Sequence, residues 1–79
     1  VVPAADVEAE ALAVATRLAT GPTRAYGGMR ALLRQSFETG LREQLAAEKD
    51  LIVDAAATED ATEGIAAFAA KRRPTFTGR

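Results

Sequence analysis

Apolar side chains recur at helical spacing along four stretches of this chain, and glycine, proline or threonine separates one stretch from the next. The spacing predicts helices over residues 6–19, 22–37, 39–57 and 60–72, joined by very short links, and it predicts no strand. In the first break, TGPT at 20–23, a glycine follows the last helical turn and a proline suits the first turn of the next helix. The sequence therefore predicts an all-α fold with about four helices, in one unit that covers residues 1–79.

Glycine and acidic residues mark two places where these helices need special packing or capping. Gly27 and Gly28 lie inside the second helix, where each glycine costs about 1 kcal/mol relative to alanine. We therefore expect another element to pack close to the backbone there, or the helix to bend. At the start of the fourth helix, Asp60 followed by Glu63 resembles a capping box with the aspartate as the cap.

The apolar content of the chain is high, but its apolar side chains are small. Apolar residues make up 48% of the chain, yet nineteen residues are alanine and only four are aromatic. Burial of apolar surface stabilises a fold by about 25 cal/mol per Å², and ordering of the chain costs about 1.5 kcal/mol per residue. The net free energy of folding of such a chain therefore lies near zero. We expect it to need a partner, either more of its own protein or other copies of itself. Two β-branched residues before Pro3 suit an extended segment, and we expect further residues to precede Val1.

The polar residues argue against catalysis and metal binding within this chain. There is no cysteine or histidine, and Ser36 is the only serine, so no catalytic residue is expected here. A solvated helix face explains the carboxylates of the third helix, so neither a metal site nor a cofactor is expected; these carboxylates are Glu43, Glu48, Asp50 and Asp54.

Charge and hydropathy also narrow the expected partners. Arg30 and Arg34 could contribute to a nucleic-acid face, but Glu38 shares it and the pI is about 5.3, so nucleic acid is not expected. No apolar run approaches the roughly 20 residues that span a bilayer, so no membrane partner is expected. No cysteine pattern suggests a secreted disulfide scaffold. A soluble protein of the cytoplasm is therefore expected.

The chain ends in AFAAKRRPTFTGR at 67–79, which combines aromatic rings with a basic cluster. Phe68 lies one helical turn before Lys71, which would place a ring and an ammonium on one helix face, followed by Arg72 and Arg73. A ring for stacking beside a cation for phosphate suits a ligand that contains a nucleotide. The alternative is that Phe68 belongs to the core and the cations only complement the carboxyl end of the helix dipole.

The order of short motifs resembles the carboxy-terminal end of the enoyl-CoA hydratase/isomerase (crotonase) superfamily, over essentially all 79 residues. The most specific part is the pattern D-x-x-E-G-x-x-A-F-x-x-K-R-x-P-x-F at 60–76, and the turn LATGPT at 18–23 supports it. Within the superfamily, the sequence of residues 21–34 and the ending PTFTGR are most similar to members of the phenylacetyl-CoA ring-degradation type.

The resemblance implies a specific role for this helical region. Family members carry their oxyanion hole and catalytic carboxylates in a larger domain, which this chain lacks, so the chain alone would be inactive. Their last helices cover the active site and pack between subunits of trimers or hexamers. In several members the final helix meets the CoA of a neighbouring subunit, which would give Phe68 the adenine and Lys71 a phosphate, with Arg72 and Arg73 as further candidates. The implied parent is an acyl-CoA enzyme of the lyase class. The alternative is a stand-alone helical self-association module without a ligand.

Overall fold

The computed structural model describes residues 1–79 and contains helices and no strand. A short 3₁₀ turn, η1 (Ala4–Asp6), precedes four α-helices: α1 (Val7–Ala19), α2 (Thr23–Gln35), α3 (Leu41–Ala56) and α4 (Glu59–Ala69). The all-α fold with four helices is therefore confirmed. The helix limits agree with the sequence-based ranges to within two residues, except that α4 ends at Ala69 and not at residue 72.

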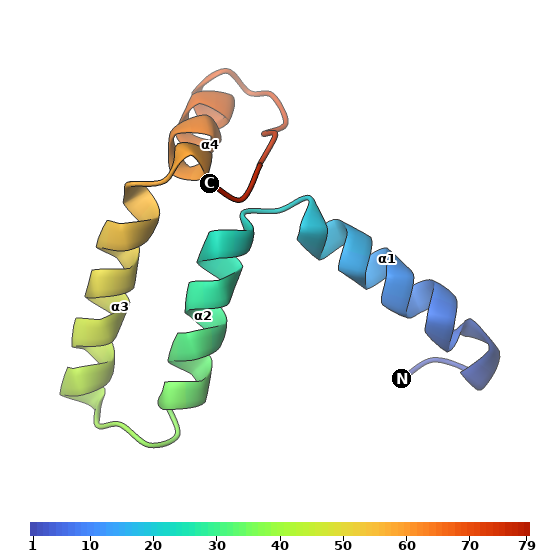
Figure 1. The fold of residues 1–79 in the computed structure, drawn as a ribbon, viewed down its shortest axis with the longest axis horizontal. Helices are drawn as coiled ribbons and strands as arrows, with labels where there is room; N and C mark the ends of the chain where they lie inside the picture. The colour runs from blue at the N-terminus through green and yellow to red at the C-terminus, as the bar shows by residue number, and fades with distance from the viewer.

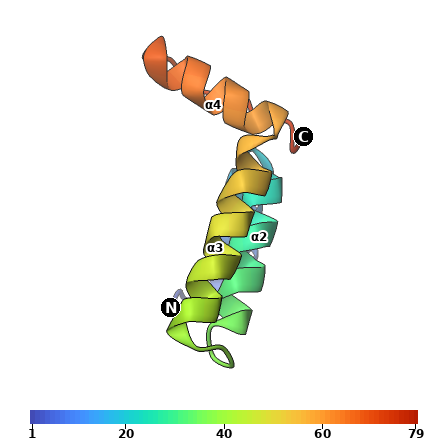
Figure 2. The same ribbon diagram turned by 90° about the vertical axis from the view of Figure 1, so that its left-hand side faces the viewer.

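The helices form an antiparallel pair with two appendages (Figure 1). Helices α2 and α3 lie side by side, and α4 runs steeply across their end, as Figure 2 shows. Helix α1 points away from the rest, and every one of its residues is exposed. The carboxy-terminal segment after α4 turns back toward the start of α2.

Glycine explains how closely α2 approaches its neighbours. A Cβ atom added to Gly28 would collide with the side chain of Leu51 on α3, whereas one added to Gly27 would meet nothing within 4 Å. The close approach predicted from this glycine pair is therefore confirmed at Gly28 alone. Gly21 is buried against the ring of Tyr26 and does not have the positive φ of a left-handed helix cap, so its role is to leave space for that ring.

The cap of α4 is Thr58, and the prediction of Asp60 as the capping residue is wrong. The Thr58 hydroxyl accepts a hydrogen bond from the Ala61 amide at 3.0 Å and donates one to the Ala55 carbonyl at 2.7 Å. Thr58 has the extended backbone that a capping residue needs, with φ −85° and ψ 155°. Asp60 lies inside the first turn, so its carboxylate is free to bind elsewhere.

The chain has almost no core of its own. Only Gly21, Asp60 and Ala67 are buried, while Phe37 and Phe68 are 90% and 87% exposed. The radius of gyration is 15.8 Å, against about 12 Å for a compact chain of this length. Large apolar side chains are thus open to contact on α1, α2, α3 and α4. No helix is both long enough and apolar enough to cross a membrane.

Candidate functional site

The carboxy-terminal segment is fastened to α4 by two acidic side chains, the first of which is Asp60. Its two carboxylate oxygens accept hydrogen bonds from the backbone amides of Thr77 at 2.7 Å and Gly78 at 2.9 Å. In return, the Asp60 amide donates to the Arg79 carbonyl at 2.8 Å. Only 4% of Asp60 is exposed, so this buried carboxylate is satisfied by the tail.

Glu63, one turn further along α4, fastens the middle of the same segment. The Arg72 guanidinium donates to both of its oxygens, at 2.6 and 2.8 Å, and the Thr75 amide donates to one of them at 2.8 Å. These hydrogen bonds, that from Arg72 first, lower the pKa of Glu63 from its ordinary 4.5 to about 2. The same pairing raises the pKa of Arg72. We call the bonds of Asp60 and Glu63 to residues 72–79 the tail clasp.

Helix α4 ends in a tight turn that includes a lysine in the left-handed conformation. The Arg72 amide donates to the Ala67 carbonyl at 3.0 Å, and the Lys71 amide donates to the Phe68 carbonyl at 3.2 Å. This pair of bonds defines a Schellman motif, in which the left-handed residue is usually glycine. Here that residue is Lys71, with φ 52°, and it is the one non-glycine residue of the chain with a positive φ.

The four sequence-predicted site residues occupy different environments around this turn. Phe68 is 87% exposed, so the alternative that it belongs to a core formed by these 79 residues does not hold. Lys71 is exposed and Arg73 is exposed, and neither side chain has an ion-pair or hydrogen-bond partner in this chain. Arg72 is engaged by Glu63.

Phe68 and Lys71 do not share a helix face, contrary to the prediction from their spacing. The helix ends at Ala69, and Lys71 follows the cap residue Ala70 with left-handed backbone angles. The direction of the Lys71 side chain is therefore set by the turn and not by helical spacing. The sequence signal that could have shown this is Pro74, which prevents the helix from continuing far past residue 71.

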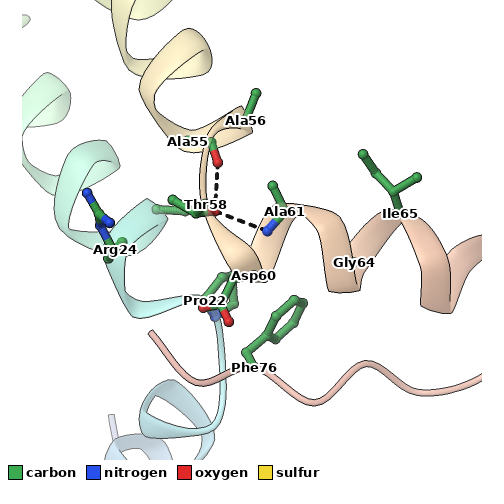
Figure 3. Close-up of a pocket in the computed structure, with 11 residues that line it drawn as sticks. Pro22, Arg24, Ala55, Ala56, Thr58, Asp60, Ala61, Gly64, Ile65 and Phe76 are labelled. Atoms are coloured by element: carbon green, nitrogen blue, oxygen red, sulfur yellow. Dashed lines mark hydrogen bonds between the residues drawn. The ribbon is translucent and has the colours of Figure 1, made fainter. Parts of the chain in front are cut away.

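A shallow apolar cavity of about 410 Å³ lies where α2 begins, α3 ends and α4 starts (Figure 3). The Phe76 ring forms one side of it and lies against Gly64, where an added Cβ would be 3.6 Å from the ring. Ile65 and Pro22 are among the other lining residues. Sequence reasoning missed this cavity, although the glycine one turn after Asp60 was a signal that something large packs there. Its lining suits an apolar side chain better than polar chemistry.

The polar groups needed for catalysis or metal binding do not come together. Ser36 caps the carboxyl end of α2, and its hydroxyl donates a hydrogen bond to the Leu33 carbonyl at 2.8 Å. No group of three or more aspartate, glutamate, histidine or cysteine side chains is arranged to hold a metal ion. The arrangement can therefore contribute rings, cations and apolar surface to a site.

Comparison with known proteins shows the family to which the chain belongs. Residues 1–79, the whole chain, match the family described as enoyl-CoA hydratase/isomerase. The chain belongs to this family. It is similar to a probable enoyl-CoA hydratase of Mycobacterium tuberculosis, with 43% identity over 79 residues, which is 100% of this chain and 31% of that protein. It is also similar to 2,3-dehydroadipyl-CoA hydratase of Escherichia coli, with 45% identity over 69 residues, 87% of this chain and 27% of that protein.

The fold is that of a part of these enzymes. The crystal structure of an enoyl-CoA hydratase from Geobacillus kaustophilus matches 98% of this chain with a TM-score of 0.92 and 28% identity, but this match covers only 29% of that chain. The chain therefore spans about 30% of the length of the relatives that it matches.

Proposed function

We propose that these 79 residues are the carboxy-terminal helical region of an acyl-CoA enzyme that hydrates or isomerises an enoyl-CoA. In this proposal the region completes the CoA site of a neighbouring subunit and holds subunits together as a trimer or hexamer. The oxyanion hole and catalytic carboxylates belong to the remainder of the enzyme, so the 79 residues alone are inactive. The family membership and the names of the relatives support the acyl-CoA part of the proposal.

The observation that carries the site is the exposure of Phe68 in the last turn of α4, together with an exposed and unpaired Lys71 three residues later in the chain. An exposed ring offers a face on which adenine can stack, and base–aromatic stacking contributes about 1–3 kcal/mol. An ammonium without an ion partner is free to bind a phosphate. Arg73, which also has no partner, is the second candidate for a phosphate.

The apolar side chains support the role in assembly. Helix α1 exposes Leu12 and Leu18, and α3 exposes Ile52 and Val53. Surfaces of this kind mark contacts with other protein. In the proposal, the remainder of the enzyme and the neighbouring subunits cover them. The finer proposal, that the enzyme is of the phenylacetyl-CoA degradation type, rests on the sequence of residues 21–34 and on the ending PTFTGR.

The test compares two substrates in the complete enzyme that contains this chain: an enoyl-CoA, and the same acyl group on pantetheine, which lacks the nucleotide. Phe68→Ala and Lys71→Ala should each raise KM for the enoyl-CoA about tenfold. Neither should change kcat/KM for the pantetheine thioester, because that substrate reaches neither residue. Lys49→Ala, which removes an exposed ammonium of α3, should leave the kinetic constants for both substrates unchanged.

The alternative, a helical self-association module without a ligand, is favoured by the exposed apolar surface alone. It predicts that Phe68→Ala and Lys71→Ala leave the enoyl-CoA kinetics unchanged. Equal losses with both substrates would also count against the proposed site, because they would report damage to the fold.

A further inference from the structure

Lys71 adopts a backbone conformation that its side chain does not favour. Its φ of 52° lies in the left-handed region, which glycine enters far more readily than lysine. Residues held there cost about 1–3 kcal/mol and persist only where their surroundings fix them. Something beyond the two backbone bonds of the turn must therefore hold Lys71.

The structure contains such a restraint at the next residue. Arg72 is tied to Glu63 by two short hydrogen bonds from one planar guanidinium to one carboxylate, a pairing with fixed geometry. The Thr75 amide shares that carboxylate at 2.8 Å. Arg72 Nη1 also donates to the Arg73 carbonyl at 3.2 Å, which ties the pair to the backbone after the turn. The restraint thus spans both sides of Lys71, from α4 to the tail.

The same contacts divide the basic cluster into two kinds of cation. Arg72 has its charge matched by Glu63, and that carboxylate would lose its ion partner if Arg72 turned to a phosphate. The ammonium of Lys71 has no partner in this chain. Within the cluster, Arg72 is therefore poorly suited to bind a ligand and well suited to hold its neighbour.

We infer that Glu63 and Arg72 are positioning residues, whose ion pair holds Lys71 in the left-handed turn and so presents its ammonium to a phosphate of the nucleotide. The inference rests on the proposed function. It removes Arg72 from the candidates for direct CoA contact and gives it a role through Lys71. It also gives Glu63, which the sequence pattern predicts as a helix-capping residue, a part in ligand binding.

The test is a double-mutant cycle on CoA affinity in the complete enzyme, with isothermal titration calorimetry and CoA itself as the probe. Glu63→Gln removes the ion pair but leaves an oxygen for the Thr75 amide. We expect it to weaken CoA binding about fivefold when Lys71 is present, and less than about twofold in the Lys71→Ala background, since coupled residues are non-additive. Asp50→Asn is the matched control, because it removes the carboxylate of an exposed ion pair with Lys49 on α3.

A conservative change gives a second, independent reading. Arg72→Lys keeps the charge but loses the two-pronged geometry, so its CoA affinity should lie between those of the wild type and Arg72→Gln. If Glu63→Gln does not fold, as judged by its melting temperature, the cycle is run with Arg72→Lys and Lys71→Ala. An affinity that rises or stays constant in Arg72→Gln would overturn the inference.

The outcomes separate this inference from the proposed function. If Lys71→Ala and Phe68→Ala leave CoA affinity unchanged, the proposed function itself fails. If they weaken binding and Glu63→Gln does not, the positioning inference alone fails. If Glu63→Gln weakens binding by the same factor with and without Lys71, Glu63 does not act through Lys71, and the inference is again overturned.

Discussion

Removal of the Asp60 carboxylate should release the end of the tail from α4. In Asp60→Ala, the amides of Thr77 and Gly78 lose their only acceptors in this chain. The Thr77 hydroxyl, which lies 3.5 Å from the same carboxylate, loses a weaker contact. Helix α4 itself should remain, because its cap is Thr58 and not Asp60.

The size of the effect follows from these two amide bonds. Hydrogen bonds to a charged group contribute about 1.5–3 kcal/mol each. Thr77 is exposed and Gly78 is half-buried, so both amides can turn to water after the change, and the lower value applies. We expect the tail to lose about 3 kcal/mol of local stability, which raises its open population roughly a hundredfold. Asp60→Asn should recover less than half of this, because an amide side chain has only one acceptor oxygen.

Amide hydrogen exchange, read by mass spectrometry on a peptide from the tail, measures that population directly. Thr77 and Gly78 should exchange at close to unprotected rates in Asp60→Ala, while the amides of α3 keep their wild-type rates. Asp54→Ala is the control, because Asp54 is an exposed carboxylate on α3 with no bond to the tail. Wild-type protection of these two tail amides in Asp60→Ala would refute the role assigned to the carboxylate.

Three further tests, with four substitutions between them, examine the other contacts. Gly27→Ala places a methyl group in open space and should raise the free energy of unfolding in urea by about 0.5–1 kcal/mol. Gly28→Ala should have a free energy of unfolding about 1–3 kcal/mol lower than that of Gly27→Ala, because its new methyl group meets α3. Equal values for the two variants would contradict the packing. The pKa of Glu63 is depressed from 4.5 to about 2, so its pairing with Arg72 stabilises the fold fully above pH 4.5. The stability difference between the wild type and Glu63→Gln should therefore shrink as the pH falls from 4.5 to 2, and a constant difference in acid titrations would count against it. Lys71→Gly should stabilise the protein by about 1 kcal/mol in thermal melts and yet weaken CoA binding; a gain in both would contradict the proposed site.

Local patterns were enough to predict the helices and the close approach at α2. Helical spacing located all four helices, and Gly28 does face Leu51 as a glycine inside a helix suggested. The open arrangement could not be predicted in detail, because it depends on which apolar faces find partners. The sequence indicated only that the apolar residues are too small for a self-sufficient core, and the exposure of residues such as Phe37 agrees with this.

The candidate site was predictable in its composition but not in its geometry. The rings and cations near residues 68–73 were visible in the sequence, and so was Pro74, which stops the helix. The sequence did not show which cations are paired and which are free. That difference depends on a contact between Glu63 and Arg72, which are nine residues apart and meet only when the tail reverses direction. For the same reason, local sequence predicts Asp60 as a helix cap, because its actual partners, Thr77 and Gly78, come 17 and 18 residues later.

The distribution of internal restraints separates α4 and its tail from the other helices. Two of the three buried residues, Asp60 and Ala67, belong to α4, and the tail clasp supplies ion-paired and charge-assisted bonds within this chain. Helix α1, by contrast, has no buried residue at all. The turn around Lys71 can therefore be ordered before any partner arrives. In the proposed CoA site, an element that is already ordered would lose less conformational entropy when its ligand binds, so the clasp would favour affinity without itself contacting the ligand.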